Sequence, residues 1–290
     1  MQCGSLLYKD TEKEIMKPML KIELERAFTS ISFKIAVIIG MAVSVLEFVR
    51  KVIPAAANPV MYFKPYADNM PLNVHNMWLA GSRDMYYEVF LRILPILVVL
   101  PYAATYYTDI HRGLIKNYYT RTNKADYIIA KFTAVFITGG LVAVIPVIFS
   151  LMATSAVLPS FIWPNGNMSY QPSGMWISIL YTHPYVYYIM YIVLQFVRSG
   201  MLATIPLIIS PWVNNSFIVL LFPVVLCEFL NVVTGWSSVS YIKALAPKRI
   251  LSINQLAPNY WQSYVIFILV ILFFDIISYV LRGIKDETLY

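Results

Sequence analysis

Long apolar runs recur along the chain, separated by shorter polar segments. Six of these runs approach the roughly 20 residues that an α-helix needs to cross the hydrocarbon core of a bilayer. The strands of a membrane barrel alternate polar and apolar residues, whereas runs such as VIFILVILFF do not. The pattern predicts an all-α membrane protein with six transmembrane helices, at about 31–49, 87–108, 128–157, 183–210, 216–235 and 262–281.

The residues before the first predicted span carry an amphipathic pattern. Met16, Leu20, Leu24 and Phe28 recur every four residues, with Lys and Glu residues off that stripe. We interpret residues 1–30 as an interfacial segment whose helix lies on the membrane surface and leads into the first span. A solvated helix packed on a partner is the alternative. No internal repeat or separate soluble region is visible, so we expect residues 1–290 to form one transmembrane domain.

Composition and charge placement add an orientation to this topology. Charged residues make up only 13% of the chain, whereas soluble domains carry about 25%. The net charge is +7, but the basic residues gather at the ends of apolar runs, which indicates membrane topology and not nucleic-acid binding. With both termini inside, the inner side holds twelve Lys and Arg residues and the outer side seven, so we expect cytoplasmic termini.

The chain lacks the usual signatures of catalysis and metal binding. A Walker loop requires a Gly followed by Lys, and none of the 11 glycines is followed by Lys. His75, His111 and His183 lie far apart, and no H-E-x-x-H or G-x-S-x-G spacing occurs. We therefore expect no metal site, no cofactor and no ATP hydrolysis in this chain by itself.

Four charged residues fall inside the predicted spans at matching depths. At about 1.5 Å per residue, Arg92 and Glu228 lie about 8 Å and about 12 Å from the outer ends of their spans. Arg198 and Asp275 lie deeper, at about 22 Å and about 20 Å. Because charges inside a bilayer are unfavourable unless they are paired, we expect the pairs Arg92–Glu228 and Arg198–Asp275. Such pairs either hold the bundle together or line a polar route for a substrate.

A tyrosine-rich sequence, YTHPYVYYIMY, opens the fourth predicted span. We place Tyr181, Tyr185 and Tyr188 on one face of that helix. Aromatic side chains collect at membrane interfaces for physical reasons alone, which is one explanation. Contact with an amphipathic or aromatic substrate is the other.

A basic segment, DIHRGLIKNYYTRTNKADYIIAK, separates the second and third spans at residues 109–131. A loop that only fixes topology explains its charge, but not the tyrosines held beside the charges. Here the chain resembles the membrane subunits of type 2 ABC exporters, in which a charged run, a Gly, a basic residue, a Tyr or Ile and a Lys lead into the third span. The residues that carry the resemblance are Asp109, Gly113, Tyr119, Thr120, Arg121, Lys124, Tyr127 and Lys131.

The resemblance implies a short cytoplasmic coupling helix on which a cytosolic ABC ATPase subunit docks. The implied contact residues are Arg112, Gly113, Lys116, Tyr119, Arg121, Lys124, Asp126 and Tyr127. ATP and Mg then belong to the ATPase partner, which explains the missing Walker loop. The resemblance also implies short gate helices at 239–256 and a pathway formed with a second permease copy or a related permease.

These expectations together describe the permease subunit of an ATP-driven exporter, embedded in the lipid of a bacterial plasma membrane. Amphipathic compounds such as peptides, antimicrobials or drugs fit as substrates. A secondary transporter or channel and a membrane-embedded processing enzyme are the alternatives. Secondary carriers usually consist of two related halves with interrupted helices, and two such halves are not visible in this sequence.

Overall fold

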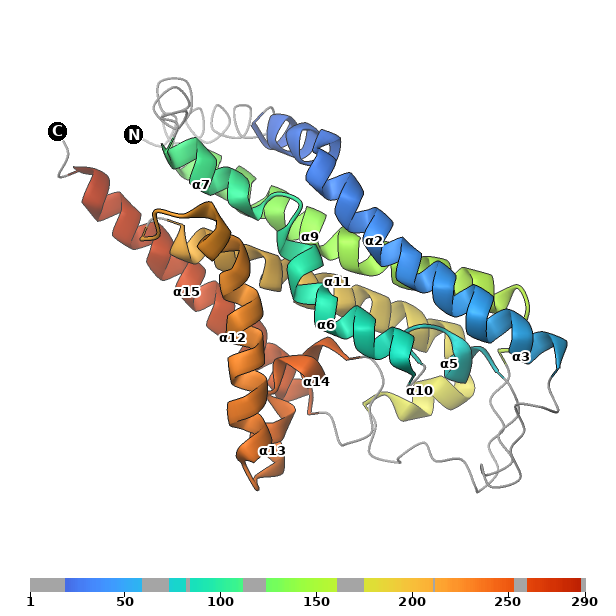
Figure 1. The fold of residues 1–290 in the computed structure, drawn as a ribbon. Helices are drawn as coiled ribbons and strands as arrows, with labels where there is room; N and C mark the ends of the chain where they lie inside the picture. The colour runs from blue at the N-terminus through green and yellow to red at the C-terminus, as the bar shows by residue number, and fades with distance from the viewer. Residues whose placement is uncertain are drawn as a thin grey trace, which may run out of the picture.

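The computed structural model describes residues 19–58, 73–81, 84–111, 124–160, 175–210, 212–252 and 260–287. These residues are almost entirely helical and form no strand, as the apolar runs predict. Residues 19–29 form a first helix. The helices after it are α2 (Ile31–Glu47), the π-helix η1 (Phe48–Val52), α3 (Ile53–Ala57), α5 (Val74–Met77), α6 (Met85–Val99), α7 (Ala103–His111), α9 (Lys124–Ser155), α10 (Ile177–Thr182), α11 (Pro184–Ile209), α12 (Ser216–Trp236), α13 (Ser240–Ala244), α14 (Pro247–Leu251) and α15 (Trp261–Glu287) (Figure 1).

Five continuous helical stretches in the described part of the chain are long and apolar enough to cross a membrane. They are Ile31–Ala57, Lys124–Ser155, Pro184–Ile209, Ser216–Trp236 and Trp261–Tyr279. Each coincides with one of the six predicted spans. The protein is therefore a helical, multi-pass membrane protein.

The remaining predicted span, 87–108, is not one continuous helix. It forms α6 and α7, which are separated by a turn at residues 100–102. Pro101 lies in this turn, and proline has no backbone N–H to donate to the preceding helical turn. An interior proline alone does not break the helix, because Pro95 lies within α6. The chain direction thus changes between α6 and α7, which hydropathy does not reveal.

Capping residues account for several helix starts. The side chain of Ser30 accepts a hydrogen bond from the backbone N–H of Phe33, so α2 begins as a new helix after residues 19–29. Asp84 caps α6 through the N–H of Tyr87, and Asn215 caps α12 in the same manner. Ser, Asp and Asn are favoured at this position because their oxygens accept from otherwise unpaired N–H groups.

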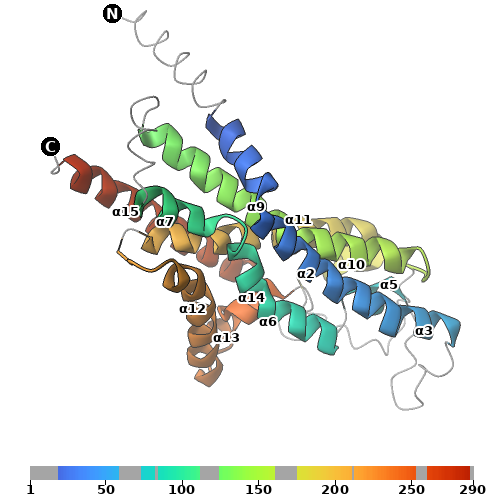
Figure 2. The same cartoon turned by 45° about the horizontal axis from the view of Figure 1, so that its top comes forward.

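Helices α9 and α11 form the centre of the bundle. Of their most apolar windows, 56% and 61% are buried, against 22% for each of the other three candidate spans. Figures 1 and 2 show α2 and α15 on opposite sides of this pair, while α12 diverges from the bundle axis. The outer helices therefore expose most of their apolar side chains, as lipid-facing helices do.

The α9–α11 contact depends on two glycines that face phenylalanines reciprocally. A Cβ on Gly140 of α9 would lie 2.6 Å from the ring of Phe196, and a Cβ on Gly200 of α11 would lie 2.7 Å from the ring of Phe136. The two phenyl rings meet edge to face, with centroids 5.5 Å apart. Small residues let membrane helices approach closely, which is the basis of this packing.

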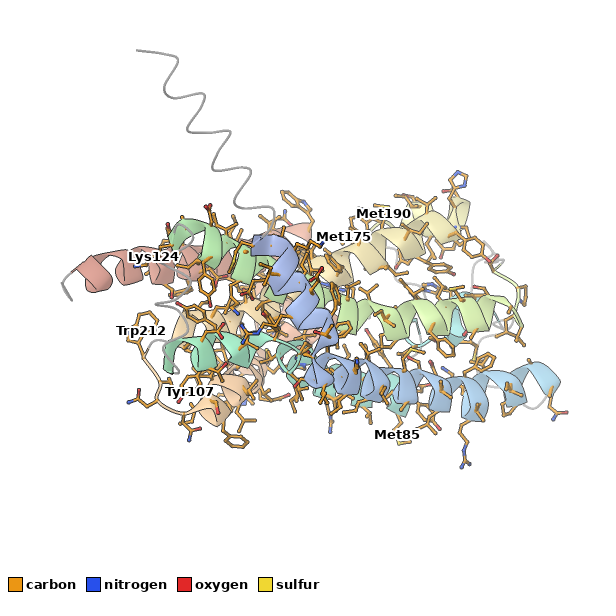
Figure 3. All side chains as sticks on the ribbon, turned by 90° about the horizontal axis from the view of Figure 1, so that it is seen from above. Met85, Tyr107, Lys124, Met175, Met190 and Trp212 are labelled. Atoms are coloured by element: carbon orange, nitrogen blue, oxygen red, sulfur yellow. The ribbon has the colours of Figure 1, made fainter. Side chains whose placement is uncertain are left out.

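The bundle has one end at which several described segments gather. Residues 19–29, the end of α7, the start of α9 and the end of α15 lie at this end, and α3, α5 and α10 lie at the other (Figures 1 and 2). The view from above places Lys124, Tyr107 and Trp212 toward the same end, away from Met85 (Figure 3). We call this the α7 end of the bundle.

The substitution Gly140→Ala tests the close helix contact. The added methyl group would lie 2.9 Å from the backbone oxygen of Phe196, so rotation of the phenyl ring alone does not relieve the clash. Overpacking of this kind costs about 1–3 kcal/mol, and we expect the melting temperature of the purified protein to fall by about 5 °C.

Gly235→Ala is the matched control, because nothing lies within 4 Å of a Cβ at that helical position. Its melting temperature should stay unchanged or rise slightly, since Ala is the better helix former. Equal effects of the two substitutions would contradict the proposed close α9–α11 contact.

Candidate functional site

Four charges, three of them buried and one half-buried, meet at the α7 end of the bundle. The ammonium of Lys131 on α9 lies 2.8 Å from Glu23 Oε2 and 2.7 Å from Asp109 Oδ2. Arg26 donates two hydrogen bonds to the Asp109 carboxylate, at 2.9 Å and 3.2 Å. Glu23 and Arg26 belong to the helix of residues 19–29, so the group joins three separate segments. We call Glu23, Arg26, Asp109 and Lys131 the charge cluster.

Two tyrosines complete the charge cluster. The hydroxyl of Tyr102 donates to Glu23, and the hydroxyl of Tyr127 donates to Asp109 Oδ2 at 2.9 Å. The Lys131 ammonium also lies 4.6 Å from the centroid of the Tyr102 ring. Hydrogen bonds to the remaining lone pairs are what make burial of such ions tolerable.

Burial makes the charge cluster dependent on all its members. Glu23 and Asp109 are fully buried, and the Lys131 side chain is 1% exposed. The two acids and two bases sum to no net charge, so the desolvated ions compensate one another. Removing a single partner from such a group leaves an unpaired buried charge and costs about 3–5 kcal/mol.

Electrostatic interactions within the charge cluster keep the half-buried Arg26 and the buried Asp109 ionised. Burial alone raises the pKa of Asp109, but the charges of Lys131 and Arg26 outweigh burial and hold that pKa below its usual 3.8. Burial lowers the pKa of Arg26, and the Asp109 carboxylate more than offsets this and raises it. The stability that Asp109 contributes is therefore complete above its unfolded pKa and is lost only as the pH falls through the lowered folded value.

Helical spacing explains how the three segments present these groups. Tyr127 and Lys131 are four residues apart on α9 and therefore share a face, and Glu23 and Arg26 share a face of their helix by a spacing of three. The buried positions of the first helix are Met19, Glu23 and Ala27. Glu23 is thus the one polar residue on the otherwise apolar buried face of this helix, and it belongs to the charge cluster.

The first helix differs here from the sequence prediction. The predicted membrane-facing stripe includes Leu20, Leu24 and Phe28, and Met16 lies outside the described residues. Leu20 and Leu24 are partly buried and pack against the core, whereas Phe28 is exposed and meets the ring of Phe33. The helix is therefore docked on the bundle along a face beside the predicted stripe.

The charge cluster joins the two ends of the basic segment at residues 109–131. Asp109 is the first residue of this segment and Lys131 is the last, and Tyr127 lies four residues before Lys131. Of the predicted docking residues, five lie outside the described residues: Arg112, Gly113, Lys116, Tyr119 and Arg121.

The three described docking residues do not form one open surface. Lys124 is half-buried, whereas Asp126 and Tyr127 are buried. Tyr127 faces the charge cluster, where it donates its hydrogen bond to Asp109. Tyr127 therefore anchors the start of α9 in the bundle, and neither Asp126 nor Tyr127 offers its side chain to solvent.

Arg198 is fully buried in α11, but its partners are not the predicted ones. Its guanidinium donates to the backbone oxygens of Ile250 and Ser252, and it lies over the ring of Tyr264. It also donates to Gln195, one turn earlier on the same helix. Arg198 therefore holds the C-terminal end of α14 against α11.

Asp275 accepts a hydrogen bond from Thr204 of α11, at 2.9 Å. The predicted Arg198–Asp275 pair is therefore wrong. Arg198 contacts the end of α14, whereas Asp275 contacts Thr204 of α11. Thr204 lies about 9 Å along the helix from Arg198, so the two charges are not level as their equal predicted depths implied. The short helices α13 and α14 fall within the predicted segment 239–256, whose residues 253–256 lie outside the described part.

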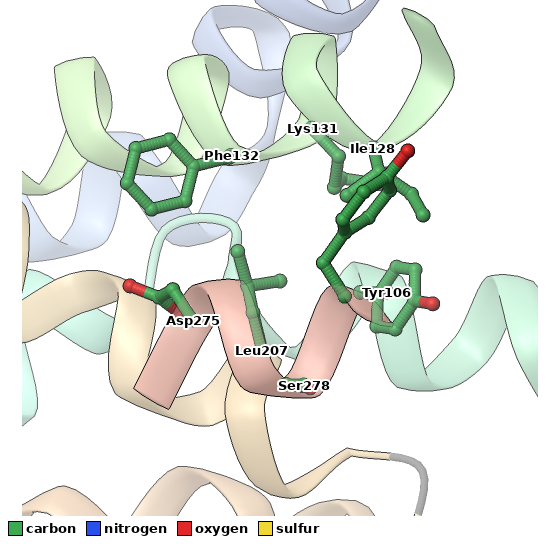
Figure 4. A pocket seen from close by; sticks show the side chains of 8 residues that line it. Tyr106, Ile128, Lys131, Phe132, Leu207, Asp275 and Ser278 are labelled. Atoms are coloured by element: carbon green, nitrogen blue, oxygen red, sulfur yellow. The ribbon is translucent and has the colours of Figure 1, made fainter. Parts of the chain in front are cut away.

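Asp275 also lines a small cavity with Lys131 (Figure 4). The other lining residues are Tyr106, Ile128, Phe132, Leu207, Ser278 and Tyr279. Its volume of about 30 Å³ is enough for one or two water molecules and for nothing larger. The cavity therefore places solvent-sized space beside the charge cluster without offering a substrate site.

Arg92 and Glu228 line a second small cavity between α6, α12 and α14. Both side chains line this cavity, but they form no ion pair in the described part of the chain, so the predicted Arg92–Glu228 pair is not present there. Both residues are exposed. An exposed charge within a membrane helix costs at least about 2.5–3.5 kcal/mol on insertion scales unless it faces water or protein.

The predicted tyrosine face is divided between two helices. Tyr181 lies in α10 and Tyr185 in α11, with the helix interrupted at His183, and both tyrosines are exposed. Tyr188 is fully buried and packs against Trp78, with ring centroids 5.2 Å apart. The rings of Tyr185 and Tyr188 still meet edge to face, with centroids 5.9 Å apart, so these two tyrosines lie beside each other on α11 although only Tyr185 is exposed.

Sequence analysis did not identify the charge cluster. Glu23 was only one of the Glu residues beside an apolar stripe, Arg26 had no assigned contact, and Asp109 and Lys131 were named for the resemblance of the basic segment without a predicted contact between them. Their contacts span 83 and 108 residues of sequence. The one available signal was a spacing of three between an acid and a base on the same helix.

No group of His, Cys, Asp and Glu residues suited to a metal ion occurs in the described ranges. The fold and the buried charges define a multi-pass helical membrane protein with a polar cluster at one end. No protein family, curated protein or solved structure matches this chain. The function must therefore be argued from the arrangement of the residues themselves.

Lys131→Met tests the dependence of the fold on the charge cluster. The change leaves Glu23 and Asp109 buried with Arg26 as the only remaining base, so we expect a loss of about 3–5 kcal/mol and a melting temperature lower by about 10 °C.

Lys21→Met is the matched control. Lys21 lies 3.8 Å from Glu25 in the same helix, but both side chains are largely exposed, and such pairs contribute little. Its melting temperature should change by no more than about 2 °C. If the Lys131→Met variant had the same melting temperature as the wild type, the charge cluster would not stabilise the helix junction.

Proposed function

We propose that the chain is the permease subunit of an ATP-driven ABC exporter, coupled to a separate cytosolic ATPase subunit. The observation that carries the proposal is the charge cluster, because it joins both ends of the basic segment, on α7 and α9, to the first helix. A docked partner that moved this segment would move all three together. The sequence resemblance of residues 109–131 to type 2 ABC exporters supports the same assignment.

The cluster suits the transmission of a movement. Asp109 and Lys131 connect the two ends of the basic segment, and Arg26 connects them to the first helix, which continues into α2. Buried ion pairs with several hydrogen bonds resist rotation, unlike flexible surface pairs. A displacement of the segment would thus reach α2, α7 and α9 at once.

Electrostatics favours an acidic docking surface on the partner. Residues 112–124 contain Arg112, Lys116, Arg121 and Lys124 and no acidic residue. Complementary charge steers association and fixes orientation more than it adds affinity. The contact would consist of these bases and Tyr119, with ATP and Mg bound by the partner.

The proposal includes a membrane topology. The helices α6 and α7 together form the second passage, which gives six passages and places both termini in the cytoplasm with the basic segment. The short helices α13 and α14, of which Arg198 holds α14, then lie near the outer side as a gate. Two copies, or this chain and a related permease, form the pathway.

The substrate class follows from the exposed aromatic groups near α10. Tyr181 and Tyr185 are exposed and offer ring faces with polar ends. An amphipathic peptide, antimicrobial or drug fits such a surface. We propose export of a compound of this class from a bacterial plasma membrane.

Arg121→Glu tests the coupling to an ATPase. The chain is purified from its native membrane with any ATPase bound to it, and ATP hydrolysis is measured in lipid vesicles with candidate amphipathic compounds. We expect stimulated hydrolysis with the wild type and a reduction of about tenfold or more with Arg121→Glu, because like charges then face the acidic surface.

Arg50→Glu is the matched control, since it reverses an exposed charge at the opposite end of the first span. It should leave the stimulation unchanged. Recovery of the chain without any ATPase, or equal stimulation with Arg121→Glu, would contradict the proposed function.

A further inference from the structure

An unusual pair of charges lies on the outward face of α6 and α12. Arg92 of α6 and Glu228 of α12 are both exposed, and both line the cavity between these helices. Arg92 lies about 10 Å from the start of α6, and Glu228 lies about 12 Å from the end of α12. Both charges are thus well within the lengths of their helices, where lipid would be an unfavourable neighbour.

Nearby polar groups on the same face are satisfied within the chain. Lys248 of α14 forms an ion pair with Glu88 at 2.7 Å, and its backbone N–H donates to Asn231 at 2.9 Å. Arg92 and Glu228 have no such partner among the described residues. The face therefore presents one free base and one free acid, side by side.

The two helices surround these charges with the same pattern. On α6, Arg92 lies between the exposed Val89 and Ile96, which are three residues before it and four residues after it. On α12, the exposed Val225 and Val232 flank Glu228 with the same spacing. A stripe with this three-and-four spacing is the pattern with which one helix packs against another.

We propose that a second copy of this chain packs on the α6–α12 face, with Arg92 of each copy paired to Glu228 of the other. A twofold axis places the same patch on both copies, so a patch that carries one base and one acid is complementary to itself. The symmetric contact contains two ion pairs, flanked by the valines and Ile96. Both charges leave the lipid when the copies associate.

This inference deepens the proposed function, because it names the face at which two permease copies meet. Its test needs no ATPase. A failure of dimerisation is therefore separable from a failure of coupling, which the ATP hydrolysis experiment measures.

The test uses two charge reversals in differently tagged copies. Arg92→Glu alone places four acids at the symmetric contact, and Glu228→Arg alone places four bases there. A mixed pair of one Arg92→Glu copy and one Glu228→Arg copy restores an acid opposite a base at both contacts. We expect co-purification of the two tags to fall about tenfold or more for each variant with itself and to return in the mixed pair.

The pair Glu88 and Lys248 provides the matched control, because its ion pair lies within one chain. Mixing Glu88→Lys copies with Lys248→Glu copies should give no recovery beyond that of each variant alone. Size-exclusion profiles and melting temperatures of all variants exclude misfolding as the cause of lost co-purification.

Three results would overturn the proposal. Wild-type copies with different tags that do not co-purify would show that the face has no second copy on it. Single reversals that co-purify like the wild type would show that the contact lies elsewhere. The third result concerns the double variant Arg92→Glu/Glu228→Arg in one chain. If it restored co-purification while mixing Arg92→Glu copies with Glu228→Arg copies did not, the two residues would pair within each copy and lipid would cover the face.

Discussion

The ammonium of Lys131, held between the carboxylates of Glu23 and Asp109, is the interaction on which the α7 end of the bundle depends. It connects the first helix to α7 and α9, and Arg26 closes the group by its bidentate contact with Asp109. Because the ions are desolvated, no member can be removed without leaving an unpaired charge. The junction is therefore far more rigid than a surface loop with the same residues.

The rest of the bundle is organised around a different principle. The close approach of α9 and α11 at Gly140 and Gly200 gives a dense centre, and the buried polar side chains of Gln195, Arg198 and Ser199 lie beside it on α11. Other polar groups lie outside this centre: the charge cluster at the α7 end, and the exposed Arg92 and Glu228 on α6 and α12. Within α11, Arg198 holds the end of α14. A dense centre between a charged junction and a polar face is consistent with a bundle that transmits movement.

The sequence predicts the spans well, because hydropathy and local capping act over short distances. Residues 184–209 and 216–236 form helices within a residue or two of the predicted limits, aided by Pro184 and the Asn215 cap. The turn at Pro101 was missed because a proline in an apolar run does not by itself mark the end of a helix. Pro95, six residues earlier, lies inside α6. The link from the first helix to the charge cluster and the backbone partners of Arg198 were missed, because rotation about a helix axis and contacts across 52 to 108 residues leave no local pattern.

The central claim is that the first helix, α7 and α9 move as one unit when a partner acts on the basic segment. Spin labels at the exposed Ile22 and Ile129, in a chain with Cys3 and Cys227 replaced by alanine, report the distance between the first helix and α9. Double electron–electron resonance with the ATPase partner, before and after ATP binding, measures that distance directly. An unchanged distance, with a changed distance from Ile129 to the exposed Phe273 of α15, is the predicted result. Separation of Ile22 from Ile129 on ATP binding would contradict the account.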